Sequence, residues 1–260
     1  MARLLELWIA AVLLTACDQE AMLERFTPKE ETEFAKRYLA LFQAQDFEAI
    51  EKEIDPSLKD SQLRQKLERM AGFFPKEAPK VVRVVGSYTN TTGDTKTANL
   101  SFEYEYPRAW VLANVVVQRK GDALLVKGVH VQPATASLAT VNQFTFDGKE
   151  PKHFALLAGA ALVPVFIVFA LVAAVRTPIP KRKWLWIIFI LLGFVQISLN
   201  WTTGDFGVAP LGFQLLGSGF TKMGPYAPVI ITTSLPIGAI IFLLRRKHWL
   251  NQAQTVHGEG

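Results

Sequence analysis

Cysteine is nearly absent from this chain, because Cys17 is the only one among 260 residues. A single thiol excludes a disulfide within the chain, and it also excludes metal sites that need several thiolates. Histidine is scarce as well, with four residues in all. The chain therefore has to fold by burying apolar side chains, and we predict no metal site, no cofactor and no catalytic residue.

Acidic residues are scarce after residue 153, where Asp205 and Glu259 face eight lysines and arginines. Up to Glu150 the acidic and basic side chains are nearly balanced. The pI of about 9.3 therefore arises from cations that stand beside apolar segments. A protein that binds nucleic acid needs a basic surface instead, so we predict no nucleic-acid partner.

A short apolar run near the start ends in the residues Leu14-Thr15-Ala16-Cys17. They resemble the signal of bacterial lipoproteins, in which small residues precede the cleavage point and the cysteine thiol accepts a lipid. The resemblance implies a signal peptide over residues 1–16, lipidation of Cys17 with palmitate-type chains, and sorting by Asp18 that retains the protein in the inner membrane. Glu6 departs from the pattern because it weakens the positive region that precedes the apolar run. An incidental thiol in an ordinary signal segment is the alternative.

Three uncharged runs are long enough to cross a bilayer, and they cover residues 154–175, 184–200 and 225–244. The first would form a helix roughly 33 Å long, about the thickness of a hydrocarbon core. The second is at the short end of what can cross. The sequence therefore predicts a membrane domain at residues 151–250 with three transmembrane helices, followed by a tail at residues 251–260.

Basic residues gather after the first and the third of these runs. They are Arg176, Lys181, Arg182 and Lys183 in one cluster, and Arg245, Arg246 and Lys247 in the other. If all three runs cross, both clusters fall on the same side of the membrane, and the positive-inside rule makes that side cytoplasmic. The C-terminus is then cytoplasmic, and the segment before the first run lies in the periplasm, where a lipid on Cys17 would also be.

Two further features belong to the predicted membrane domain. Ser234 and Gly238 lie four residues apart in the third run, a spacing that lets helices approach closely. We expect this contact within the chain, with oligomerisation as the alternative. The segment 201–224 is uncharged from residue 206 to residue 221 and rich in apolar side chains. We expect it to lie in the membrane interface or to be re-entrant.

Residues 27–150 have the pattern of a water-soluble domain, joined to the lipidated cysteine by a linker at residues 17–26. Apolar residues at helical spacing predict three helices between residues 28 and 74. Alternating residues then predict four strands joined as an antiparallel meander, at about residues 81–88, 98–106, 110–120 and 123–132. We therefore predict an α+β domain, with a polar hinge at residues 147–152 before the first membrane run.

Two segments give this domain a resemblance to a known family. The helix opening Phe34-Ala35-Lys36-Arg37-Tyr38-Leu39 and the bend Gln45-Asp46-Phe47-Glu48-Ala49-Ile50, with the strand-rich second half, are similar to the nuclear transport factor two-like family. The resemblance covers about residues 27–133 and implies a cone-shaped sheet with helices in its concave face. That family includes enzymes, ligand binders and interaction modules, so the likeness says little about chemistry. A generic α+β domain is the alternative.

The titratable residues of the predicted sheet are His130, Glu103 and Glu105. A general base would require these groups to converge inside the cone, whereas strand alternation predicts that all three lie on the solvated face. We therefore predict a non-enzymatic binding or assembly module for an envelope partner. A ligand-binding or enzymatic cone, and an accessory subunit of a membrane transport complex, are the alternatives.

Overall fold

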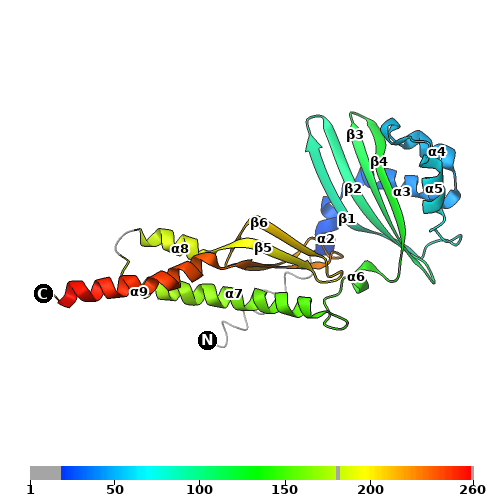
Figure 1. The fold of residues 1–260 in the computed structure, drawn as a ribbon. Helices are drawn as coiled ribbons and strands as arrows, with labels where there is room; N and C mark the ends of the chain where they lie inside the picture. The colour runs from blue at the N-terminus through cyan, green and yellow to red at the C-terminus, as the bar shows by residue number, and fades with distance from the viewer. Residues whose placement is uncertain (1–18, 180–181, 259–260) are drawn as a thin grey trace. The chain divides into compact units, whose positions relative to one another are not determined.

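The structure is a computed structural model that describes residues 19–179 and 182–258. The chain divides into two compact units. Of the described residues, the first unit contains residues 19–141 with Gly224–Ala227, and the second contains residues 142–223 with residues 228–258. Each unit contains one four-stranded antiparallel sheet with helices against it (Figure 1). Cys17, Asp18 and Lys181, which carry predictions, lie outside the described residues.

Most helices of the first unit come before its strands. Those before the strands are α2 (Gln19–Phe26), α3 (Lys29–Ala44), α4 (Phe47–Glu53), the 3₁₀ turn η1 (Pro56–Leu58) and α5 (Leu63–Ala71). Asp46 caps α4, because its carboxylate accepts a hydrogen bond from the Ala49 N–H at 3.1 Å. Local sequence signals thus set where this helix starts.

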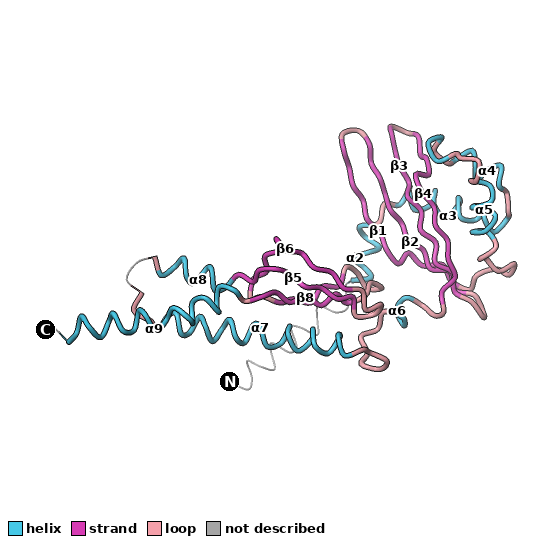
Figure 2. The backbone as a smooth tube through the Cα atoms, viewed as in Figure 1, coloured by secondary structure: helices cyan, strands magenta, loops and turns pink. Residues whose placement is uncertain are grey.

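The strands of the first unit form a meander. They are β1 (Val81–Thr92), β2 (Thr95–Glu105), β3 (Trp110–Lys120) and β4 (Ala123–Ala134), in the spatial order β1-β2-β3-β4. The short helix α6 (Leu138–Val141) follows. Helices α3 to α5 cover one face of this sheet (Figure 2). This is the order of elements that periodicity and alternation predict for the soluble domain.

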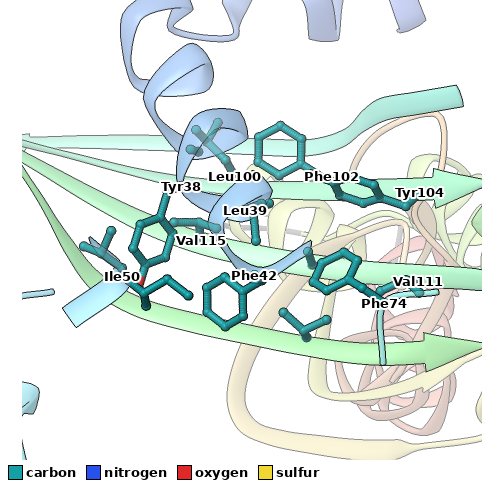
Figure 3. Packing of buried hydrophobic residues seen from close by; sticks show 14 of the residues in the cluster. Tyr38, Leu39, Phe42, Ile50, Phe74, Leu100, Phe102, Tyr104, Val111 and Val115 are labelled. Atoms are coloured by element: carbon teal, nitrogen blue, oxygen red, sulfur yellow. The ribbon is translucent and has the colours of Figure 1, made fainter. Parts of the chain in front are cut away.

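The core of the first unit lies between that sheet face and the helices. Tyr38, Leu39 and Phe42 of α3 point toward the strands and are fully buried. Figure 3 shows them against Phe102 and Val115 of the sheet. Alternate residues of β2 and β3 face this core, so each strand buries one apolar side. Apolar side chains fill the concave side of the sheet.

The second unit combines helices and strands in a different order. Its elements are α7 (Pro151–Arg176), α8 (Lys183–Leu191), β5 (Leu192–Asn200), β6 (Phe206–Leu215), β7 (Ser218–Lys222), β8 (Val229–Leu235) and α9 (Ile237–Gly258). The strands pair antiparallel in the order β6-β5-β8-β7. Helix α7 runs beside this sheet and then beside α8 and α9 (Figure 2).

The prediction of three transmembrane helices is wrong. Among the described residues, one helix is long and apolar enough to cross a membrane, namely α7, with 26 residues and a mean hydropathy of 2.7. The predicted span at 184–200 is a short helix that continues as strand β5, and the span at 225–244 begins as strand β8 and becomes helix α9 only at Ile237. The protein is an α+β fold with two antiparallel sheets.

The local sequence explains both corrections. In β5 the polar residues Gln196, Ser198 and Asn200 alternate with apolar ones, which is the period of a strand. In the third run, β-branched residues fill positions 229–233, and Pro236 follows. Proline disfavours a helical conformation in the residue before it and is accepted at a helix start, so the helix begins after the strand.

Candidate functional site

Helix α7 leaves a long apolar face uncovered. Leu162, Val165 and Val175 are 66%, 67% and 62% exposed, and Phe169 is 59% exposed. Only 22% of its most apolar window is buried inside the structure, whereas the core helix of a soluble protein is mostly buried. An exposed apolar surface of this length marks contact with a membrane or with another protein.

The opposite face of α7 packs within the second unit. Leu156 and Ala160 contact Leu199, Trp201 and Ile231 of the sheet side. Farther along, α7 packs against α8 and α9 through an apolar cluster of Ile167, Ala170, Ala173, Ala174, Ile190, Ala239 and Phe242. One face of the helix is therefore structural, and the other is available to its surroundings.

The two basic clusters meet at one end of the second unit. The Nε of Arg246 on α9 donates to the Thr177 hydroxyl at 3.2 Å, just after α7. The Nζ of Lys183 donates to the Val175 carbonyl at 2.6 Å. We call this region the basic end, and its described members are Arg176, Arg182, Lys183, Arg245, Arg246 and Lys247. The fold brings together cations that lie far apart in the sequence.

A buried aromatic cluster surrounds Trp201 at the start of α7. Trp201 is 1% exposed, and its indole N–H donates to the Thr145 carbonyl at 2.7 Å. Phe144 stacks on it at 4.6 Å between ring centroids, and His153 meets it edge-on at 5.3 Å. The predicted polar hinge at residues 147–152 therefore lies inside the second unit, next to a packed aromatic core.

The segment 201–224 is largely strand rather than loop. It contains β6 and β7, with a tight turn at residues 200–205 in which the Asn200 side chain accepts from the N–H of Thr202 at 2.9 Å. Phe206, Phe213 and Phe220 of these strands are about as exposed as the outer face of α7, at 60%, 61% and 59%. Its apolar side chains thus add to the exposed apolar surface of the second unit.

The predicted packing residues Ser234 and Gly238 do not share a helix. Ser234 lies in β8, where its hydroxyl donates to the Gly217 carbonyl at 2.9 Å. Gly238 lies in the first turn of α9, and a Cβ there would come within 1.9 Å of the Phe189 carbonyl oxygen. Both are points of close backbone approach within the chain, reached through a strand and a helix.

The candidate acid–base residues of the first unit do not converge in its core. His130 is exposed and lies 3.4 Å from the Gln132 side chain. Glu103 is not solvated as predicted, because it is 1% exposed and accepts the Leu138 N–H at 2.5 Å. Arg83 reaches both Glu103 and Glu105, at 3.4 Å and 3.2 Å. The segment after β4, which includes Leu138, covers Glu103. No local sequence pattern predicts that this segment packs there.

Sequence reasoning missed a second buried carboxylate, Glu31 in the first turn of α3. It is 2% exposed and pairs with Lys96 at 3.1 Å and Arg119 at 3.0 Å. Burial alone raises the pKa of this carboxyl, but hydrogen bonds from its own backbone, Lys96 and Arg119 outweigh that effect and hold the pKa below its ordinary value. The network ties the start of α3 to the sheet.

Two grooves mark the surface of the first unit. One of about 590 Å³ lies between α2, α3 and β1, with Lys36 paired to Glu33 at 2.9 Å on its wall. The other, of about 320 Å³, lies between η1, α5 and β4 over an apolar floor that includes Leu67 and Val126. In the described part of the chain, no group of three histidine, cysteine or acidic residues is arranged to hold a metal ion.

Comparisons with known proteins do not assign the chain to a family. The chain matches no protein-family model, no curated protein and no solved structure. The resemblance of residues 27–133 to the nuclear transport factor two-like family therefore stays a prediction.

Proposed function

We propose that this protein is an inner-membrane lipoprotein whose first unit acts as a non-enzymatic binding or assembly module for an envelope partner. The observation that carries the proposal is the uncovered apolar face of α7, which is 26 residues long and only 22% buried over its most apolar window. In water that face would favour aggregation, whereas in lipid it is satisfied. The membrane placement rests on α7 together with the lipoprotein-type signal at Cys17.

The assignment of the first unit to binding is supported by what fills its sheet. Helices α3 to α5 occupy the concave face with apolar side chains, among them Tyr38, Phe42 and Leu67, each fully buried. Ligand sites combine an open apolar cavity with a few convergent polar groups. A filled concave face instead leaves the outer surfaces of the unit for contact, which suits a protein partner.

Orientation follows from the proposed anchors. A lipid on Cys17 and a span at α7 would place the first unit in the periplasm, with the basic end on the cytoplasmic side. Two attachments on either side of a folded unit restrict it to partners in or beside the inner membrane. The partner is therefore expected to be a membrane protein or one held at the membrane surface.

The test uses the full chain in cells. A photo-crosslinking amino acid replaces Tyr88, which is 69% exposed in β1, and the same is done for a Cys17→Ser chain behind a conventional cleavable signal. We expect one discrete crosslinked protein, recovered less with Cys17→Ser, and labelled palmitate on the Cys17 chain alone. Equal recovery from both chains would refute a role for the lipid. A palmitate label that survives Cys17→Ser would refute the lipoprotein assignment.

A further inference from the structure

We propose that the basic end of the second unit binds the phosphate headgroups of anionic phospholipids. This inference rests on the proposed function, because it requires α7 to lie in a membrane. It assigns a class of ligand to the basic end, whose charges otherwise indicate only how the chain is oriented in the membrane. Three observations carry it: a positioned guanidinium, unopposed charge, and apolar side chains beside the cations.

Thr177 positions the guanidinium of Arg246. The Thr177 side chain is 1% exposed, and its hydroxyl donates to the Ala173 carbonyl at 2.6 Å while it accepts from the Nε of Arg246 at 3.2 Å. The remaining N–H groups of the guanidinium have no partner among the residues that the structure describes. They form a planar fork that matches phosphate oxygens, and an arginine held in advance loses less freedom on binding.

Lys183 is held close by through the end of α7. Its ammonium donates to the carbonyl of Val175, two residues before Thr177, at 2.6 Å. This contact satisfies one of the free carbonyls at the helix C-terminus, where a cation is favoured. The Nζ can donate further hydrogen bonds. The C-terminal end of α7 therefore holds both the ammonium of Lys183 and the guanidinium of Arg246.

The positive charge of the basic end is not balanced within the described residues. Every ion pair that the structure shows lies at or before Lys152. The acidic residues described in the second unit are Asp147 and Glu150, just before α7, and Asp205, in the turn next to Asn200. They lie toward the far end of α7, which is about 39 Å long. An anion is the missing complement.

Apolar side chains stand directly beside these cations. Val175 precedes Arg176, Trp184 follows Lys183, and Leu244 precedes Arg245, with exposures of 62%, 61% and 75%. A free phosphate would use the charges alone, whereas a phospholipid also covers the apolar neighbours. The ligand that fits both is an anionic lipid at the cytoplasmic leaflet.

Trp186 and Trp249 provide a reporter, since their rings lie 5.1 Å apart on α8 and α9. The full chain is reconstituted into phosphatidylcholine vesicles that contain a rising fraction of brominated phosphatidylglycerol or of brominated phosphatidylcholine. Bromine quenches tryptophan emission when the lipid is adjacent. We expect quenching at a lower fraction of the anionic lipid than of the neutral one.

Two variants test the geometry against mere charge. Arg246→Gln should lower the preference for the anionic lipid about fivefold. Thr177→Val keeps the shape and the net charge of the protein but removes the acceptor for Arg246, and it should lower the preference in the same direction. Arg69→Gln, at an exposed arginine of α5, is the matched control and should change nothing.

Several outcomes would overturn the proposal. If Arg69→Gln lowered the preference for the anionic lipid as much as Arg246→Gln, net charge alone would explain that preference. If Thr177→Val left the preference unchanged, the position of Arg246 would not matter. If excess inorganic phosphate relieved the quenching, the ligand of the basic end would be a free anion and not a lipid. Release of the chain from the vesicles by alkaline carbonate would refute the membrane placement, and with it this inference.

Discussion

The first unit buries most of its large apolar side chains, whereas the second unit exposes many of its own. Phe42 and Phe102 of the first unit are fully buried, while Leu162 and Val165 of the second are 66% and 67% exposed. Both units pair a four-stranded antiparallel sheet with helices, so architecture alone does not explain the contrast. We infer that the surroundings do: water drives burial in the first unit, and lipid accepts exposure in the second.

The largest expected effect comes from one substitution made in both units. Phe42→Ala should destabilise the first unit by about 3–5 kcal/mol, because it opens a cavity between α3 and the sheet. Phe169→Ala removes the same atoms from a side chain that is 59% exposed and should leave the fold of the second unit intact. Urea unfolding of residues 27–141 measures the first, and thermal unfolding of the full chain in detergent measures the second. Similar losses of stability at both positions would contradict the difference in burial between the two units.

A smaller effect tests backbone packing in the second unit. Gly238→Ala should destabilise it by about 3 kcal/mol, because the new Cβ would lie within 1.9 Å of the Phe189 carbonyl. Gly159→Ala is the matched control, since its Cβ would find Thr233 no closer than 3.6 Å and alanine favours a helix. Thermal unfolding of both variants in detergent should separate them. A Gly238→Ala protein as stable as the control would show that α8 and α9 do not approach as described.

The smallest expected effect concerns charge in the first unit. The pKa of Glu31 is lower in the folded state than in the unfolded chain. The contribution of this carboxylate to stability is therefore complete above the pKa of the unfolded chain, and it is lost as the pH falls through the folded pKa. Glu31→Gln should cost about 2 kcal/mol at pH 7 and weaken the loss of stability between pH 5 and pH 3. Urea midpoints of residues 27–141 across that range measure it. Glu33→Gln, at an exposed ion pair, is the control, and parallel curves for wild type and Glu31→Gln would contradict the account.

The sequence predicts the first unit well because its signals are local. Alternation gives β3 as residues 110–120, and Asp46 marks the start of α4. The burial of Glu103 depends on Leu138, and the pairing of Glu31 on Arg119, contacts that join residues 35 and 88 positions apart. Side-chain periodicity is a local property and does not predict such contacts.

Hydropathy predicts the second unit poorly because its average is high for apolar strands and apolar helices alike. The run at residues 184–200 is uncharged throughout, yet polar and apolar residues alternate in its second half, and this period of two indicates a strand. In the third run Pro236 separates strand from helix. The convergence of the two basic clusters does not require three spans, because Thr177 and Arg246 meet through the packing of α7 with α9.

The most direct test compares two side chains that are equally uncovered in the structure. Tyr88 of β1 is 69% exposed and Val165 of α7 is 67% exposed. Each is replaced by cysteine in a Cys17→Ser chain behind a conventional signal, and membranes opened to both sides are treated with a water-soluble maleimide. We predict labelling at position 88 at once and at position 165 only after detergent dissolves the membrane. Equal labelling at both positions in intact membranes would contradict the claim that α7 exposes its apolar face to lipid.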